Sequence, residues 1–304
     1  MRRLKRKNCD ILLIDLMNLA YRCVFTQGRL KHNDKSTGVI YGAINSIHSY
    51  IQLFSPKTVV LVGEGKHSRD RRRELFAGYK LGRKANLPIP KEEFYSQVDY
   101  LLDVMYNLNV SNVAVDYFEA DDVIAVLCKH YRNSQVIIVS TDGDYLQLIT
   151  DTCEVYNPNK EITISLSNFT DVCGVAPIDF LSYKAMVGDS SDKIPGIKGV
   201  GEKTALEVCN FMGYDLFEES GYENIPKNIQ KAFTPEAKEQ YELAYKLIDL
   251  HHVPLTIQEV CSSLASGIWD AEEAKDLLED IDCWSLLENW NTIEESFEVL
   301  ESVC

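Results

Sequence analysis

Short apolar runs alternate with longer segments of helical spacing in the first half of the chain. Four runs, rich in Val and Ile, are typical of buried strands: Ile11–Asp15, Thr58–Val62, Asn112–Val115 and Gln135–Ser140. Two of the segments between them, Gly38–Phe54 and Ala120–Tyr131, have the spacing of helices with one apolar side. Strands that alternate with helices predict an α/β domain built on a mostly parallel sheet.

The second half of the chain has a different pattern. Glu154–Tyr156 and Glu161–Ile164 flank the turn sequence Asn-Pro-Asn-Lys, which predicts a hairpin. The strand-like runs then stop, and helical spacing recurs over Ile178–Val187, Glu202–Phe211, Glu236–Leu250, Ala271–Leu278 and Trp284–Leu300. We therefore predict an α/β part over residues 1–177 and a helical part over residues 178–304. No low-complexity linker separates them, so we expect them to pack together.

Composition narrows the class of protein. The chain has 304 residues, of which 45% are hydrophobic, which is enough for one large core or two smaller ones. No apolar run approaches the roughly 20 residues that cross a bilayer, and the basic start leads into a strand-like run and not a signal peptide. Nine scattered cysteines without a Cys-x-x-Cys pair indicate reduced thiols. We expect no membrane contact and a cytoplasmic location, in a bacterial cell or, for a phage protein, in its host.

The net charge of −15 is distributed unevenly. Residues 251–304 contain 13 acidic residues and one Lys, whereas the first 250 residues contain 33 acidic and 30 basic residues. Between Lys66 and Lys91, nine Lys and Arg face only two acidic residues. The total charge therefore does not exclude nucleic acid as a partner. The acidic tail is either a solvated pair of packing helices or a surface for a protein partner.

Acidic residues recur at the ends of predicted strands and in turns. Asp15 ends the first strand, and further acidic residues follow later strands or open a Gly-rich turn: Glu119, Asp121, Asp122, Asp142, Asp144, Asp189 and Asp192. The carboxyl ends of parallel strands meet at one edge of a sheet. A single Asp there could cap a helix, but so many carboxylates would repel one another unless hard divalent cations bind among them. No His or Cys joins the groups, so we predict two Mg²⁺ ions, which Mn²⁺ can replace, roughly 3.5–4 Å apart as in phosphodiester hydrolysis.

A basic and aromatic segment follows the second predicted strand. Arg72, Phe76, Tyr79, Lys80 and Arg83 lie three or four residues apart, or nearly so, and on a helix they would share a broad face. Arg and Lys suit phosphate groups, and Tyr79 could stack on a terminal base. The alternative is a solvated basic helix.

A glycine-rich turn connects two predicted helices near residue 200. Its glycines let backbone N–H groups approach a phosphate, with charge added by two lysines: Gly196, Lys198, Gly199, Gly201 and Lys203. A helix and a polar turn precede it, whereas a dinucleotide-binding loop follows a strand. The turn therefore fits a grip on one DNA strand that does not read its sequence.

The motifs Glu-Ala-Asp-Asp, Thr-Asp-Gly-Asp and Val-Gly-Asp-Ser-Ser-Asp-Lys-Ile-Pro-Gly, in this order, resemble the 5′-nuclease (flap endonuclease) family. Bacteriophage 5′-exonucleases and the 5′-nuclease domain of bacterial DNA polymerase I are the members most similar. Arg-Arg-Glu-Leu-Phe-Ala-Gly-Tyr-Lys looks like the family's arch-entry segment. The resemblance runs from Asp15 to about Ala205. It implies a PIN-like sheet with flanking helices and a helical arch, then a helical part with a helix–hairpin–helix turn that binds DNA.

The resemblance also implies roles for single residues. Carboxylates of the first metal would be Asp15, Glu119 and Asp121, with Asp122 beside them, and those of the second Asp142, Asp144, Asp189 and Asp192. Lys80 and Arg83 would contact the scissile phosphate, supported by Arg72. Residues from about Arg83 to Ser96 would form part of the arch, and Gly196–Gly201 would contact the duplex, with a bound K⁺. One position departs from the family: Glu64 is the only carboxylate just after the second strand, where the family usually has Asp.

The function that follows is a two-metal 5′→3′ exonuclease and structure-specific 5′-flap endonuclease on DNA. RNase H activity on primer RNA paired with DNA would accompany it, and a monomer acting beside a DNA polymerase or a single-strand-binding protein is expected. One alternative is a non-cleaving protein of the same fold that binds branched DNA, supported only by Glu64. The other is a ribonuclease of the related PIN type, against which the glycine-rich turn and the basic segment argue.

Overall fold

The computed structural model describes residues 8–32, 35–82, 86–211 and 227–302. Its centre is a seven-stranded sheet with the order β11-β5-β4-β1-β6-β7-β8, in which the five inner strands are parallel and the two edge strands antiparallel. In chain order these strands are β1 (Ile11–Asp15), β4 (Thr58–Val62), β5 (Ser111–Val113), β6 (Val136–Val139), β7 (Cys153–Asn157), β8 (Ile162–Ile164) and β11 (Leu264–Ala265). The predicted α/β class with a mostly parallel sheet is confirmed, and so is the predicted hairpin, as β7 and β8.

Alternating side chains of the strands build two cores, one on each face of the sheet. Leu12 and Ile14 of β1 face one layer of helices, and Ile11 and Leu13 face the other. The first layer contains α1 (Leu16–Gln27), α2 (Gly38–Phe54), α4 (Lys91–Tyr106), α13 (Ala271–Asp280), α14 (Trp284–Leu287) and α15 (Trp290–Glu298). The second contains α5 (Ala120–His130), η1 (Gly143–Leu148), α6 (Phe169–Cys173) and α12 (Ile257–Ser263). The sheet is thus buried on both sides, as a parallel sheet requires.

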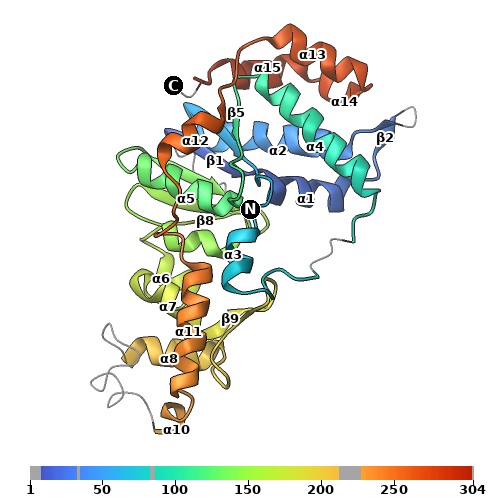
Figure 1. Cartoon of the computed structure of the whole chain (residues 1–304). Helices are drawn as coiled ribbons and strands as arrows, with labels where there is room; N and C mark the ends of the chain where they lie inside the picture. Colours follow the sequence, from blue (N-terminus) through green and yellow to red (C-terminus); the bar gives the residue numbers. More distant parts are fainter. Residues whose placement is uncertain (1–7, 33–34, 83–85, 212–226, 303–304) are drawn as a thin grey trace.

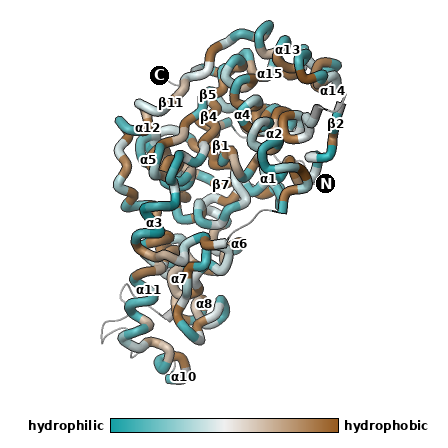
Figure 2. The backbone as a smooth tube through the Cα atoms, turned by 45° about the vertical axis from the view of Figure 1, so that its right-hand side comes forward, coloured by the Kyte–Doolittle hydropathy of each residue, from teal (hydrophilic) through white to brown (hydrophobic). Residues whose placement is uncertain are grey.

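A helical projection extends from the carboxyl end of this sheet (Figure 1, Figure 2). It contains η2 (Pro177–Asp179), α7 (Phe180–Val187), α8 (Glu202–Phe211), α10 (Lys227–Gln230) and α11 (Pro235–Ile248), with the two-stranded β9 (Gly188–Asp189) and β10 (Ile194–Pro195). Small apolar clusters of its own stabilise it, with Met186, Val200 and Val208 in one and Leu181, Ala244 and Leu247 in another.

After α11 the chain returns to the α/β part. β11 pairs with β5 at the edge of the sheet, α12 packs against α5, and the acidic helices α13 and α15 pack on α4 and α2 (Figure 1). The described residues after about 253 therefore lie with the sheet and not with the helical projection. The predicted division at residue 177 stays a proposal. Within the described ranges no helix is both long and apolar enough to cross a membrane.

Some elements differ from the predicted ones. The helices α1 and α4 were not predicted, and the predicted helix Trp284–Leu300 is two helices, because Asn289 leaves helical geometry with φ −111° and ψ 16°. α1 and α2 are linked by a short hairpin, β2 (Lys31–His32) with β3 (Lys35–Ser36). The expected arch over 83–96 lies partly outside the described residues, and its described part becomes helical only at Lys91, where α4 begins.

Candidate active site

Carboxylates from separate segments meet at the carboxyl edge of the sheet, and several of them cap helices there. Asp15, the last residue of β1, accepts the Asn18 N–H at 3.0 Å at the start of α1. Asp142 accepts the Asp144 N–H at 2.9 Å at the start of η1. Glu119 and Asp122 form a capping box at the start of α5. Capping and a shared acidic site are therefore not alternatives here, since the same side chains do both.

Asp15 and Asp142, with Ser140 and Tyr145, form what we call the β1 cluster. Asp15 Oδ2 accepts hydrogen bonds from Tyr145 Oη at 3.1 Å and Ser140 Oγ at 3.3 Å, and neither Asp has a basic partner among the described residues. Burial raises the pKa of Asp15 to about 6, and the charges of Asp142 and Glu64 contribute, whereas the Asn18 N–H opposes the shift. Burial also raises the pKa of Tyr145, with contributions from Asp15, Asp121 and Asp142. The cluster therefore concentrates negative charge without an internal cation.

Glu119, Asp121 and Asp122, with Arg72 and Lys80, form the α5 cluster. The Arg72 guanidinium is 2% exposed and lies 2.5 Å from Glu119, 3.2 Å from Asp121 and 2.9 Å from Asp122. Its Nε donates to the Leu247 carbonyl of α11 at 3.0 Å, and Lys80 Nζ lies 2.6 Å from Glu119. Although burial raises the pKa of Glu119, Arg72 and Lys80 hold it below its usual value. Basic side chains of the protein thus compensate much of the charge of this cluster, with Arg71 also paired to Asp122, although burial still raises the pKa of Asp121 well above its usual value.

The basic segment does not form the broad helical face that its spacing predicted. α3 spans only Asp70–Leu75, and Lys80 has φ +49°, a left-handed conformation that no continuing helix adopts. The Tyr79 ring is 2% exposed, and its hydroxyl donates to Glu119 at 2.8 Å. The expected stacking of Tyr79 on a base is therefore not supported, because the ring is enclosed by the α5 cluster. Arg83 lies outside the described residues.

Lys184, Asp144 and Asp189 form the α7 cluster, which joins the projection to the sheet. Lys184 Nζ lies 2.9 Å from Asp144 Oδ1 and 3.2 Å from Asp189 Oδ2. Asp189 also accepts the Ser191 hydroxyl at 2.7 Å and the Asp192 N–H at 3.2 Å. Asp192 in turn lies 3.6 Å from Lys80. Sequence reasoning missed Lys184, although it is the only charged residue of α7, which was the available signal.

The glycine-rich turn presents its glycines in two different ways. A Cβ at Gly196 would lie 2.2 Å from the Val187 carbonyl oxygen, so close packing explains that glycine. Gly199, with φ +87°, and Gly201 have no atom within 4 Å of where a Cβ would be. Ile197 and Val200 anchor the turn in the core of the projection, while Lys198 and Lys203 are exposed. The open part of the turn, and not Gly196, is accessible to a phosphate.

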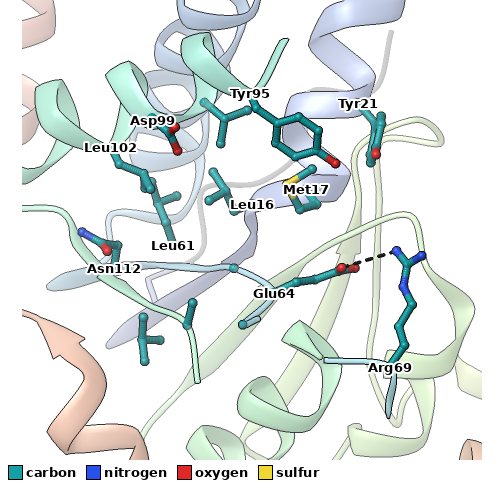
Figure 3. Close-up of a pocket in the computed structure, with 15 residues that line it drawn as sticks. Leu16, Met17, Tyr21, Leu61, Glu64, Arg69, Tyr95, Asp99, Leu102 and Asn112 are labelled. Carbon is teal, nitrogen blue, oxygen red and sulfur yellow. Dashed lines mark hydrogen bonds and ion pairs between the residues drawn. The ribbon is translucent and has the colours of Figure 1, made fainter. Parts of the chain in front are cut away.

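Glu64 lies on the loop after β4, at the mouth of a pocket of about 290 Å³ (Figure 3). Leu16, Leu61 and Leu102 form apolar walls, and Tyr21 and Tyr95 point into the same space. Glu64 contacts Arg69 at 3.5 Å, and both side chains are 34% exposed. Its charge makes a small contribution to the raised pKa of Asp15, so this carboxylate, in place of the expected Asp, acts electrostatically on the β1 cluster.

The donor chemistry of the three clusters fits hard divalent ions, because every candidate ligand is a carboxylate oxygen. In the part of the chain that the structure describes, no three His, Cys, Asp or Glu side chains are close enough together to hold one ion. Basic side chains lie among these carboxylates: Arg72 contacts the three of the α5 cluster, Lys80 lies between Glu119 and Asp192, and Lys184 lies between Asp144 and Asp189. The β1 cluster has no such side chain among the described residues, and its buried Asp15, which the charge of the exposed Asp142 disfavours further, is a carboxylate that needs a cation.

Comparison with known families assigns both parts of the chain. Residues 10–174 match the model described as "5'-3' exonuclease, N-terminal resolvase-like domain", and residues 175–267 match "5'-3' exonuclease, C-terminal SAM fold". The fold matches a T5 5′-exonuclease with bound zinc at 20% identity and a TM-score of 0.67, covering 89% of this chain and 98% of the other. A T5 flap endonuclease in a complex with DNA and metal ions gives a TM-score of 0.68 at 20% identity, over 90% and 99% of the two chains.

Some curated relatives are about as long as this chain, and others are several times longer. The chain is 29% identical to a 5'-3' exonuclease of Aquifex aeolicus, over 93% of this chain and 96% of the relative. It is 30% identical to a 5'-3' exonuclease of Buchnera aphidicola, over 74% and 76%. It is 31% identical to DNA polymerase I of Caldicellulosiruptor bescii over 73% of this chain, but it spans only 26% of that polymerase.

Proposed function

Because this chain belongs to the 5′-3′ exonuclease family of nucleases, we propose that it is a metal-dependent 5′→3′ exonuclease and structure-specific 5′-flap endonuclease acting on DNA. One observation carries the proposal: carboxylates from four separate segments meet at one edge of the sheet, and the β1 cluster among them lacks a basic partner in the described structure. Two Mg²⁺ ions, or Mn²⁺ in their place, are the proposed cofactors. When bound, they would activate water and stabilise the charge on the leaving oxygen.

The proposed ligands fall on the clusters described above. Ligands of one ion are Asp15, Glu64, Glu119 and Asp121, with Asp122 beside them, and those of the other are Asp142, Asp144, Asp189 and Asp192. Glu64 would replace the family's Asp with a longer side chain. Tyr145 and Asn18 would hold Asp15 in place, because each donates to one of its two oxygens.

Basic residues at this edge would position the DNA. Lys80 would exchange its contact with Glu119 for a phosphate, and Arg72 would hold the acidic side chains that surround it. Arg83 remains a proposed phosphate contact. At the glycine-rich turn, Gly199, Gly201, Lys198 and Lys203 would hold the duplex backbone, with K⁺ as a proposed ligand. RNase H activity, a monomeric state, a cytoplasmic location and a polymerase or single-strand-binding partner are further parts of the proposal.

A labelled 5′-flap DNA tests the proposal when it is incubated with the protein in Mg²⁺, with and without a chelator. We expect cutting near the flap junction that the chelator abolishes. Asp121→Asn and Asp142→Asn should each lower the rate at least about 10²-fold while DNA affinity, measured by anisotropy in chelator, stays unchanged. A variant that cuts at the wild-type rate would refute the two-metal assignment.

The same assay separates the alternatives. Binding of the flap DNA without cutting in Mg²⁺ or Mn²⁺ would favour the non-cleaving protein, for which the basic side chains among the carboxylates are the supporting observation. Preference for single-stranded RNA over flap DNA would favour a PIN-type ribonuclease. An RNA–DNA hybrid tests the RNase H activity separately.

A further inference from the structure

Lys184 occupies an unusual position on α7. It is the only charged residue in a helix of eight, and its side chain is 18% exposed. Its ammonium group lies between two carboxylates of different segments, 2.9 Å from Asp144 of η1 and 3.2 Å from Asp189 of β9. A lysine side chain loses considerable rotamer entropy when it is fixed in this way, so the contacts must return free energy to the fold.

Of the two carboxylates, Asp144 depends more on a cation, because Asp189 also accepts hydrogen bonds from Ser191 and the Asp192 N–H. Asp144 is 8% exposed, and burial and the charge of Asp142 raise its pKa, which Lys184 opposes. A buried carboxylate without a partner is costly, and here the lysine provides the compensating charge. A divalent ion at the same carboxylates would make the lysine redundant and would repel it.

The β1 cluster provides the contrast, since Asp15 and Asp142 receive only neutral donors in the described structure. Coordination by these two carboxylates displaces no basic side chain, whereas Glu119 and Asp121, further proposed ligands of the first ion, are paired with Arg72 and Lys80. An ion that binds Asp144 and Asp189 must first break two ion pairs with Lys184.

We propose that Lys184 is a built-in counter-ion of Asp144 and Asp189 that competes with the divalent ion at these carboxylates and thereby weakens the binding of that ion. This inference rests on the proposed two-metal function. It adds that the affinity of the second ion is set by a side chain that is not itself a ligand. Lys184 is thus a positioning residue whose removal should strengthen ion binding and not weaken it.

Binding of Mn²⁺ to the protein without DNA tests this directly, with free Mn²⁺ measured by electron paramagnetic resonance. In Lys184→Met one Mn²⁺ ion should bind on the order of tenfold more tightly than in the wild type, while binding of the other ion stays unchanged, because a charge-assisted pair no longer competes. Lys184→Gln should have the same effect, and Lys184→Arg should resemble the wild type. Lys238→Met, which removes an exposed charge of α11, is the matched control.

Thermal unfolding gives a second measurement. Without divalent ions, Lys184→Met and Lys184→Gln should unfold at a lower temperature than the wild type, and Mn²⁺ should raise the unfolding temperature more in these variants than in the wild type. Whichever of the two neutral variants folds is sufficient for the titration.

The outcomes are separable from those of the proposed function. Unchanged or weaker binding of the second ion in both neutral variants would overturn the inference, and so would equal tightening in Lys238→Met. In that case cutting of flap DNA by the wild type in Mg²⁺ would leave the nuclease proposal intact. Absence of any specific Mn²⁺ binding together with absence of cutting would instead refute the two-metal function and, with it, the inference.

Discussion

The β1 cluster and the α5 cluster lie at the same edge of one sheet, but the protein treats their charges in opposite ways. In the α5 cluster the single side chain of Arg72 contacts all three of Glu119, Asp121 and Asp122, and Lys80 adds a second cation at Glu119. In the β1 cluster the described residues give Asp15 hydrogen bonds from neutral groups only, and its pKa is raised to about 6. The charge of Glu119 therefore contributes to folding as it stands, whereas that of Asp15 costs free energy at neutral pH, and burial raises the pKa of Asp121 as well in spite of Arg72.

This difference shows which part of the edge is arranged for stability and which for a ligand. A buried acidic group without a basic partner is disfavoured unless something outside the chain compensates for it. Residues that lower stability in this way concentrate at functional sites. The comparison predicts that substitutions at the two clusters will change stability in opposite directions.

The largest expected effect is the loss of the guanidinium from the α5 cluster. Arg72→Met should lower the free energy of unfolding by about 3–5 kcal/mol, because it leaves three carboxylates at the start of α5 without their main cation. Urea unfolding in chelator at pH 7 measures it. Arg71→Met is the matched control, since Arg71 is more exposed and pairs with a single carboxylate, Asp122, at 2.7 Å, while its guanidinium lies over the Phe118 ring. A loss below about 1 kcal/mol for Arg72→Met would show that the α5 cluster does not depend on internal pairing.

The β1 cluster should respond with the opposite sign. Asp15→Asn should raise the free energy of unfolding at pH 7 by roughly 2 kcal/mol while it abolishes cutting. The folded pKa of about 6 lies above the ordinary 3.8, so the cost of the wild-type charge develops as pH rises from about 4 to 6 and is complete above that range. Below pH 4 the two proteins should converge in stability.

Asp10, at the other end of the same strand, provides the control for Asp15→Asn. A hydrogen bond from Lys57 and the Gln135 N–H lower the pKa of Asp10, so Asp10→Asn should destabilise the protein, and only above the ordinary pKa of Asp. Stabilisation by both Asn substitutions, or by neither, would mean that the position at the sheet edge does not decide the sign.

The sequence predicted the acidic edge because its signals are local. Asp15 and Asp142 follow apolar runs, and the Glu119–Asp122 motif opens a helix, so alternation of strands and helices was enough to place them at one edge. The class of fold was predictable for the same reason. The missed helix α1 begins directly at Asp15, where the preceding strand concealed the change of period.

The ion pairs and hydrogen bonds within each cluster were not predictable, because they depend on tertiary contacts. The spacing of Arg72, Tyr79 and Lys80 indicated a solvent-facing basic helix, but the chain turns after Leu75 and places all three against Glu119. Lys184 had no motif that marked it. The contrast between the two clusters is therefore a property of the folded protein, which mutagenesis can test and periodicity cannot reveal.

A smaller effect is expected for the neutral donor that supports Asp15. Tyr145→Phe removes the hydroxyl that donates to Asp15 Oδ2 at 3.1 Å and should lower the free energy of unfolding by about 1 kcal/mol. In the Asp15→Asn background the loss should shrink, because the hydroxyl then meets a neutral amide. An equal loss in both backgrounds would show that Tyr145 acts through packing and not through the Asp15 charge.

The smallest effect is expected at Glu64, which has a basic partner, unlike Asp15, but a distant one. Its ion pair with Arg69 is 3.5 Å long and partly exposed, so Arg69→Met should change the free energy of unfolding by less than about 0.5 kcal/mol. Glu64→Gln removes a negative charge that acts on Asp15 and should therefore stabilise the protein slightly at pH 7. If Arg69→Met instead costs more than about 1 kcal/mol, Glu64 depends on its basic partner as the α5 cluster does. The unusual Glu at this position would then be a structural residue, and the β1 cluster would have to bind its cation without it.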